Sequence, residues 1–162
     1  MTEFQAPRKG MRLTAWIVII ALVVGIGGGW LLSALTGGGS STPNSVWVTT
    51  ANAGSIITDG NGTLLTLKAV GNSIVKVDTA TRAAEPSDAA EFFSSWNDTF
   101  GDDARNAVVT ATGPDGDVQL VLEISNATFS EIGYVVEFDA KVVSGPETVR
   151  DLSDVTLIID AD

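Results

Sequence analysis

The 162-residue sequence contains no cysteine and no histidine, and these two absences exclude several kinds of site. Without cysteine the chain forms no disulfide and carries no lipid attached through a cysteine, so its folded part must be stabilised by burial. Without histidine it lacks the commonest general base, the commonest transition-metal ligand and the usual pH switch. It also lacks the nucleophile-elbow, phosphate-loop and dinucleotide-binding glycine motifs.

Basic residues are scarce and unevenly distributed. The chain has 9 Lys or Arg against 20 Asp or Glu, which gives a net charge of −11. Arg8, Lys9 and Arg12 lie near the start, whereas residues 13–162 contain 19 of the acidic residues. Because phosphate contacts need Lys or Arg, this acidity excludes nucleic-acid binding as the function.

One stretch, residues 13–35, is 23 residues long and has no charged side chain. As an α-helix it would measure about 34 Å, enough to cross a hydrocarbon core of about 30 Å. Trp16 and Trp30 lie near its two ends, where aromatic side chains favour the membrane interface. The sequence therefore predicts a single transmembrane helix over residues 13–36, with the lipid bilayer as a partner.

The basic residues predict the orientation of this helix. Arg8, Lys9 and Arg12 precede it and no comparable cluster follows, so residues 1–12 form a cytoplasmic tail under the positive-inside rule. The rest of the chain is then extracytoplasmic. A cleaved signal peptide is the alternative, but its apolar core spans about 7–15 residues and ends at a small-x-small site. The longer run here favours a retained anchor.

Two further features of this region concern partners. Gly25 and Gly29 have the spacing that allows close approach of a second helix, so we predict contact there with another integral membrane subunit. Glycine is also common in membrane helices without such a role. Residues 37–44, GGGSSTPN, are predicted to be a flexible linker.

Residues 45–162 are mainly strand-like. Apolar and polar residues alternate along several segments, and Asp-Gly or Pro-Asp-Gly turn signals lie between them. This pattern predicts a mainly β extracytoplasmic domain, an antiparallel β-sandwich or open barrel. The expected strands are 46–50, 56–58, 63–70, 73–78, 106–112, 117–124, 133–143 and 154–160.

One short amphipathic helix interrupts the strands. Ser87 is the expected N-cap, and Asp88 and Glu91 lie in the first turn, where the helix dipole favours acids. The apolar stripe that follows is either a recognition surface or, as we predict, part of the core. It comprises Ala89, Phe92, Phe93 and Trp96.

Trp96 is the side chain whose environment the pattern predicts in most detail. Its helical spacing places it on the stripe that faces the sheet. Strand alternation supplies a matching apolar face, so we expect Trp96 to be buried. The residues expected on that face are Leu120, Leu122, Val136 and Phe138.

Several segments of the outer domain resemble a family of small membrane-anchored or exported bacterial proteins of unassigned function. The resemblance implies a fold, a bacterial cell-membrane location and no activity. It departs where members often have Asp-Arg-Pro, because Asp78 is followed here by Thr79 and Ala80. The anchor-plus-domain layout is also similar to accessory subunits of actinobacterial respiratory supercomplexes. The matching segments are 64–67 (LLTL), 73–77 (SIVKV), 92–96 (FFSSW), 102–107 (DDARNA) and 154–160 (DVTLIID).

Acidic residues are the only candidates for chemistry. Asp98, Asp102 and Asp103 lie near the predicted helix end, and Asp115 and Asp117 flank a turn. Carboxylates can act as acid and base in glycoside hydrolysis or bind Ca²⁺, but acids at loop tips are usually solvated surface. We therefore predict no catalytic, cofactor-binding or metal-binding residues, and no cofactor.

Three hypotheses for function follow. The first is a non-catalytic accessory or assembly subunit of a larger membrane complex, with a respiratory-chain supercomplex as the best guess. The second is an independent extracytoplasmic binding module for a cation, a basic protein or a cell-envelope polymer. The third, and least favoured, is a hydrolase that uses Asp98, Asp102 or Asp103.

Overall fold

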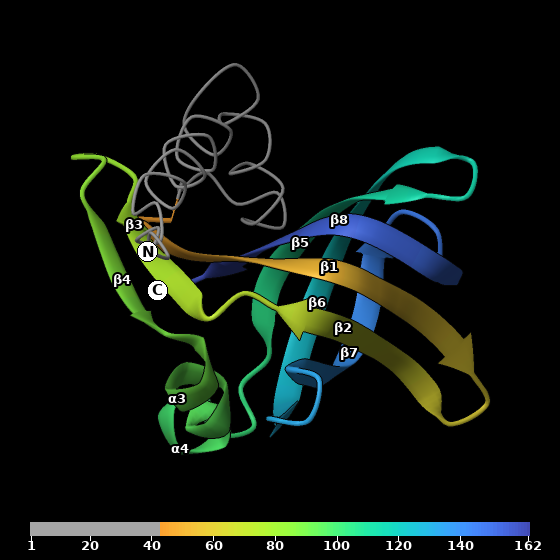
Figure 1. Cartoon of the computed structure of the whole chain (residues 1–162), viewed down its shortest axis with the longest axis horizontal. Helices are drawn as coiled ribbons and strands as arrows, with labels where there is room; N and C mark the ends of the chain where they lie inside the picture. The colour runs from red at the N-terminus through yellow and green to blue at the C-terminus, as the bar shows by residue number, and fades with distance from the viewer. Residues whose placement is uncertain (1–42) are drawn as a thin grey trace, which may run out of the picture.

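The computed structural model describes residues 43–162 (Figure 1). Among these residues, no helix combines the length and the apolar character that crossing a membrane requires. The predictions for the tail, the helix at 13–36 and most of the linker lie outside the described residues. They include those made for Arg8, Lys9, Arg12, Trp16, Gly25, Gly29 and Trp30.

Residues 43–162 fold into one sheet of eight antiparallel strands with two short helices, which confirms the prediction of a mainly antiparallel β domain. The helices are α3 (Ala89–Ser94) and α4 (Trp96–Phe100). The strands are β1 (Ser45–Asp59), β2 (Gly62–Val70), β3 (Ser73–Asp78), β4 (Ala84–Asp88), β5 (Arg105–Gly113), β6 (Gly116–Ser130), β7 (Val135–Ser144) and β8 (Val149–Asp160).

The sheet closes on itself because β1 is long enough to have two partners along one edge. Its first part, Ser45 to Val48, pairs with β3, and its later part, from Ala51 onward, pairs with β2. Six strands therefore form a closed ring in the order β2-β7-β6-β5-β8-β1, while β3 and β4 extend beyond it (Figure 1). The domain is a single closed barrel with a two-stranded extension, so neither the predicted two-sheet sandwich nor the open barrel is found.

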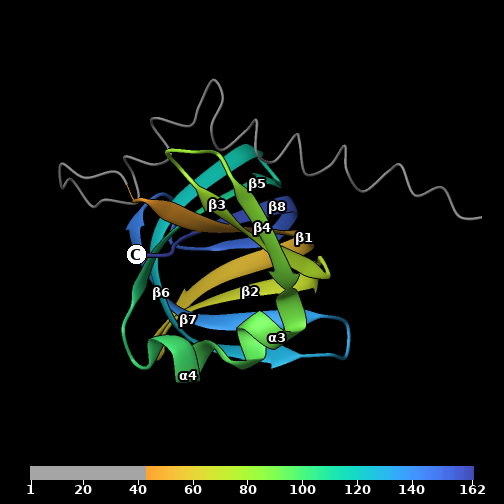
Figure 2. The same ribbon diagram turned by 90° about the vertical axis from the view of Figure 1, so that its left-hand side faces the viewer.

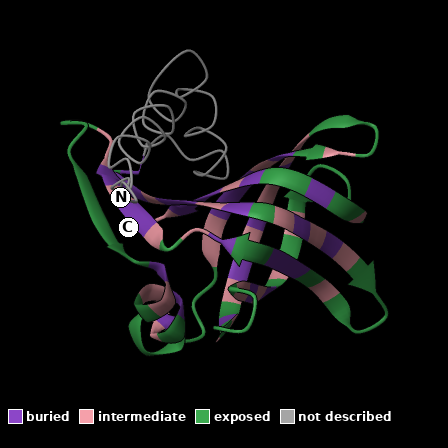
Figure 3. Cartoon of the chain, viewed as in Figure 1, coloured by how far each residue is buried: buried purple, intermediate pink, exposed green. Residues whose placement is uncertain are grey.

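Alternation along the strands fills the barrel with apolar side chains. Figure 3 shows buried and exposed residues alternating along β1, β2 and β6. The alternating apolar side chains of residues 117–124 in β6 and 154–160 in β8 are buried, with only Val118 at the start of β6 partly exposed. The largest fully buried side chains are Trp96, Phe93, Phe138, Ile56, Leu65, Leu67, Ile74, Leu120, Leu122, Ile124 and Leu157.

Strict alternation along the predicted strands 63–70 and 133–143 would point Ala69 and Tyr134 inward with Leu67 and Val136, but the backbone changes phase before or at these two residues. Ala69 has φ 51° and is exposed, and Val70 takes the buried position instead. Tyr134 has φ 50° and remains 40% exposed. The N–H groups of Ala69 and Val70 donate to the carbonyls of Gly133 and Tyr134 at 3.1 and 3.0 Å, so the two irregular sites stabilise each other.

The predicted helix is present but divided into two, and the predicted N-cap, Ser87, lies one residue before the observed N-cap, Asp88. The carboxylate of Asp88 accepts from the Glu91 N–H at 2.9 Å, whereas Ser87 lies in β4 opposite Ile74. Pairing with β3 keeps Ser87 extended, which moves the helix start to the following residue. At the other end of α3, Ser95 interrupts the helical conformation and α4 begins at Trp96.

The two helices cover one end of the barrel (Figure 2). Trp96 is fully buried, with its ring centre 5.2 Å from that of Phe138 and 4.6 Å from that of Phe100. Phe93 is buried against Phe138 as well, at 5.9 Å. The interpretation of the stripe as core is therefore confirmed for these residues, while Phe92 is only partly buried.

Candidate functional site

An open depression of the described domain lies at the β1–β2 hairpin, at the barrel end away from the helices (Figure 1). Its volume is about 560 Å³. The hairpin forms because Asp59 to Gly62 supply a tight turn, with Gly62 at φ 138°, a conformation that glycine adopts easily. The depression is lined by Ile57, Asp59, Asn61, Gly62, Thr63, Leu64, Asp139 and Ala140.

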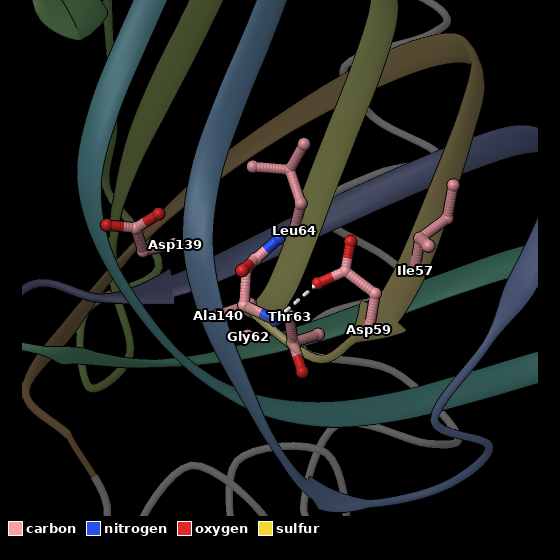
Figure 4. Close-up of a pocket in the computed structure, with 8 residues that line it drawn as sticks. Ile57, Asp59, Gly62, Thr63, Leu64, Asp139 and Ala140 are labelled. Carbon is pink, nitrogen blue, oxygen red and sulfur yellow. Dashed lines mark hydrogen bonds between the residues drawn. The ribbon is translucent and has the colours of Figure 1, made fainter.

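Two carboxylates line this depression, and both are already hydrogen-bonded. Asp59 accepts from the Asn61 N–H at 2.7 Å, which shapes the turn, and Asp139 accepts from the Asn126 side-chain amide at 2.8 Å. Figure 4 shows the Asp59 carboxylate turned toward the hairpin turn and the Asp139 carboxylate on the other side of β2 and β7, pointing away from it. They do not form the facing acid–base pair that glycoside hydrolysis requires.

The hydroxyl groups at this hairpin are also engaged. The hydroxyls of Thr58 and Thr63 lie 2.8 Å apart, and that of Thr58 donates to the Glu147 carbonyl at 2.8 Å. These bonds connect the β1–β2 hairpin to the β7–β8 loop. The depression is thus a product of hairpin geometry and contains no free nucleophile beside a base.

A second depression, of about 230 Å³, lies where β1 begins beside the β3–β4 hairpin. Asp78 lines it, and hydrogen bonds from Thr81, with smaller contributions from the Ala80 N–H and the Lys76 charge, lower the pKa of this carboxyl. The Thr81 and Ala80 N–H groups donate to Asp78 at 2.6 and 3.0 Å. Asp78 therefore holds the turn through these hydrogen bonds, and it is only partly buried.

The acidic residues singled out in the sequence do not converge. Asp98 is exposed on α4, and Asp102 and Asp103 are exposed before β5 begins. Asp115 and Asp117 lie at the other end of β5, a strand of 9 residues that separates them by about 30 Å. Within residues 43–162 no three His, Cys, Asp or Glu side chains lie close enough together to hold a metal ion.

Sequence reasoning missed the Asn126–Asp139 hydrogen bond. Asn126 has φ 51° and interrupts the alternation of β6, so that Ala127 becomes buried beyond it. A polar Asn at the point where an apolar alternation fails was the available signal, because Asn tolerates the left-handed conformation better than other non-glycine residues.

Comparison with known proteins finds no matching family model, no similar curated protein and no similar solved structure.

Proposed function

We propose that this protein is a non-catalytic, single-pass membrane protein that acts as an accessory or assembly subunit of a larger membrane complex. The observation that carries the proposal is the uncharged run of residues 13–35, preceded by Arg8, Lys9 and Arg12 and followed by the folded domain. In this arrangement residues 13–36 anchor the chain in a bacterial cell membrane, and residues 45–162 lie outside the cytoplasm.

A non-catalytic role is supported by the carboxylates of the described domain that line its depressions, because they are already engaged in hydrogen bonds. The carboxylates of Asp59, Asp78 and Asp139 are each used to hold a turn or a strand contact. The barrel interior is filled with apolar side chains, so the closed sheet encloses a hydrophobic core. The polar side chains that can contact a partner lie on the outer surface. Such a domain suits binding and positioning of partners.

The proposed partners are integral membrane subunits that contact the anchor through Gly25 and Gly29. Their spacing places both on one helix face, where a second helix can approach closely. The similarity in layout to accessory subunits of actinobacterial respiratory supercomplexes makes a respiratory-chain complex the first candidate.

Purification from membranes tests this proposal. The tagged full chain is solubilised in a mild detergent, and we expect integral membrane subunits to be recovered with it in a fixed ratio. The double variant Gly25→Leu/Gly29→Leu should reduce that recovery, whereas Gly27→Leu, on another face of the helix, should leave it unchanged. Repeated recovery of the protein alone, from membranes that retain it after alkaline washing, would contradict the subunit role.

A second candidate function is favoured by the charge of the outer domain. Residues 43–162 carry 6 Lys or Arg against 19 Asp or Glu, a net charge of −13, which attracts cations and basic proteins. An independent binding module for a cation, a basic protein or an envelope polymer would use this surface. Calorimetry of the full chain with Ca²⁺ and with isolated cell-envelope polymer, in detergent, tests it. Heat of binding without co-purifying subunits would favour the module.

A further inference from the structure

One asparagine of the described domain, Asn61, is followed directly by a glycine. Asn61 and Gly62 form the end of the β1–β2 turn, and both are exposed. A backbone nitrogen that follows an asparagine can attack its side-chain amide, and glycine hinders this attack least because it has no Cβ. The other asparagines of residues 43–162 precede serine, alanine or aspartate. They are Asn44, Asn52, Asn72, Asn97, Asn106 and Asn126.

The side chain of Asn61 is not held by the fold. Its backbone N–H donates to the Asp59 carboxylate at 2.7 Å, but its side-chain amide has no hydrogen-bond partner among residues 43–162. By contrast, the amide of Asn126 donates to the Asp139 carboxylate at 2.8 Å, and that of Asn97 donates to a backbone carbonyl at 3.5 Å. The Asn61 amide can therefore rotate toward the backbone that follows it.

The backbone around the attacking nitrogen is open. Figure 4 shows Gly62 at the turn of the hairpin, and its φ is 138°. A Cβ built at this position would meet no atom within 4 Å apart from its chain neighbours. Solvent and the Asn61 side chain can thus both reach this part of the turn.

Hydrogen bonds below the tip limit how far the hairpin opens. The Thr58 N–H donates to the Thr148 hydroxyl at 3.2 Å, and the Thr58 hydroxyl donates to the Glu147 carbonyl at 2.8 Å. Residues 59–62, above these bonds, are all exposed. Exposed turn residues open locally at little cost in free energy, so we expect the tip to open while the strands below it remain paired.

We infer that Asn61 is a site of spontaneous deamidation. The Gly62 nitrogen attacks the side-chain carbonyl carbon of Asn61, which forms a C–N bond and closes a five-membered succinimide ring. The bond from that carbon to the amide nitrogen breaks, and the departing nitrogen takes the Gly62 proton and leaves as ammonia. Water then hydrolyses either C–N bond of the ring to give aspartate or isoaspartate. Water is the only other reactant.

The modification changes both the charge and the backbone of the hairpin. Either product adds one negative charge to a chain whose net charge is already −11, in the depression that Asp59 and Asp139 line. Isoaspartate also inserts a carbon atom into the backbone of a turn whose length fixes the register of β1 and β2. Because this pairing closes the barrel, the modification should weaken closure at the hairpin. The inference goes beyond the proposed function and does not depend on it.

Mass spectrometry of the aged full chain in detergent tests the inference. After incubation and digestion, deamidation appears as a gain of one mass unit, and fragmentation assigns the gain to one residue. We expect Asn61 to react at least about tenfold faster than any other asparagine of residues 43–162, which corresponds to a barrier lower by about 1.4 kcal/mol. The rate should rise with pH, because the attacking nitrogen must lose its proton. Earlier conversion of another of these asparagines would overturn the inference.

A sample unfolded in urea separates the effect of the hairpin from that of the local sequence. Since the tip opens at little cost, the native chain should react within about tenfold of the unfolded rate. Conversion in urea without conversion of the native chain would show that the turn protects Asn61, and it would overturn the inference.

Two variants test the proposed chemistry. Asn61→Gln keeps the amide but would have to close a six-membered ring, so residue 61 should stay unmodified in a chain with the natural circular dichroism spectrum. Gly62→Ala places a Cβ beside the attacking nitrogen and should slow the reaction at least about tenfold. Its φ of 138° makes the alanine strained, so Asn61→Gln is the deciding variant. Equally fast deamidation of residue 61 in Asn61→Gln would contradict attack through a five-membered ring.

Discussion

At the scale of single residues, Trp96 is the largest fully buried side chain of the described domain. Its ring packs against Phe92, Phe100 and Phe138, yet its indole Nε1, among residues 43–162, has no hydrogen-bond partner. Trp96 therefore stabilises the fold through apolar packing alone. Substitutions of Trp96 can therefore separate the effect of side-chain volume on stability from the effect of the indole nitrogen.

We expect Trp96→Ala to lower the free energy of unfolding by about 3–5 kcal/mol, against a total of roughly 5–15 kcal/mol for a domain. Trp96→Phe should cost less, because it keeps the aromatic contact and removes an unpartnered polar group. Chemical denaturation of the full chain in detergent measures both variants. An unchanged midpoint for Trp96→Ala would show that this side chain is not part of the core.

Asp78 provides a residue-level test of pH dependence. Hydrogen bonds from Thr81 lower its pKa below the ordinary value of 3.8, so the ionised form stabilises the native state. That contribution is complete above the ordinary value and is lost as the pH falls through the lowered one. Asp78→Asn should therefore be less stable than the natural chain at pH 7, and the difference should shrink as the pH falls below 3.8. Equal stability at pH 7 would contradict this role.

At the scale of elements, the junction between β4 and α3 depends on one cap. Asp88→Ala removes the acceptor for the Glu91 N–H and should lower the free energy of unfolding by about 1 kcal/mol. Ser87→Ala is the matched control, because Ser87 is exposed in β4, and its effect should stay within about 0.5 kcal/mol. Thermal denaturation followed by circular dichroism measures the two variants. A larger loss of unfolding free energy for Ser87→Ala than for Asp88→Ala would show that Ser87 is the N-cap.

At the scale of the whole molecule, closure of the barrel depends on close approach of β1 and β2 at Gly54. A Cβ there would lie 2.8 Å from the Thr66 carbonyl oxygen and 3.2 Å from the Leu67 side chain. Gly54→Ala should therefore lower the free energy of unfolding by about 1–3 kcal/mol, through a shift in the β1–β2 pairing.

Gly71→Ala is the control for this substitution. Its Cβ would meet Thr50 no closer than 3.5 Å, an ordinary contact, so its effect should be clearly smaller. Denaturant unfolding compares the two variants in the full chain. Equal midpoints for Gly54→Ala and the natural chain would show that the barrel tolerates a wider β1–β2 spacing.

The sequence by itself determined the class of the outer domain and much of its core. Alternation of apolar residues identified the buried positions of β6 and β8, and helical spacing identified Trp96 and Phe93 as core. These signals are local, because a residue's place in a strand or helix decides which way it points.

Only the tertiary structure decided that the sheet closes into a barrel, where the alternation of side chains along the strands shifts, and whether the acidic residues come together. No spacing shows that one strand, β1, pairs with both β2 and β3, since this depends on how the strands bend around a shared core. The short strand β4, exposed throughout, has no alternation to detect. The phase changes at Ala69 and Asn126 arise from hydrogen bonds to β7 and to residues just before it. The acidic residues stayed apart because β5 separates them, a distance that only the folded chain defines.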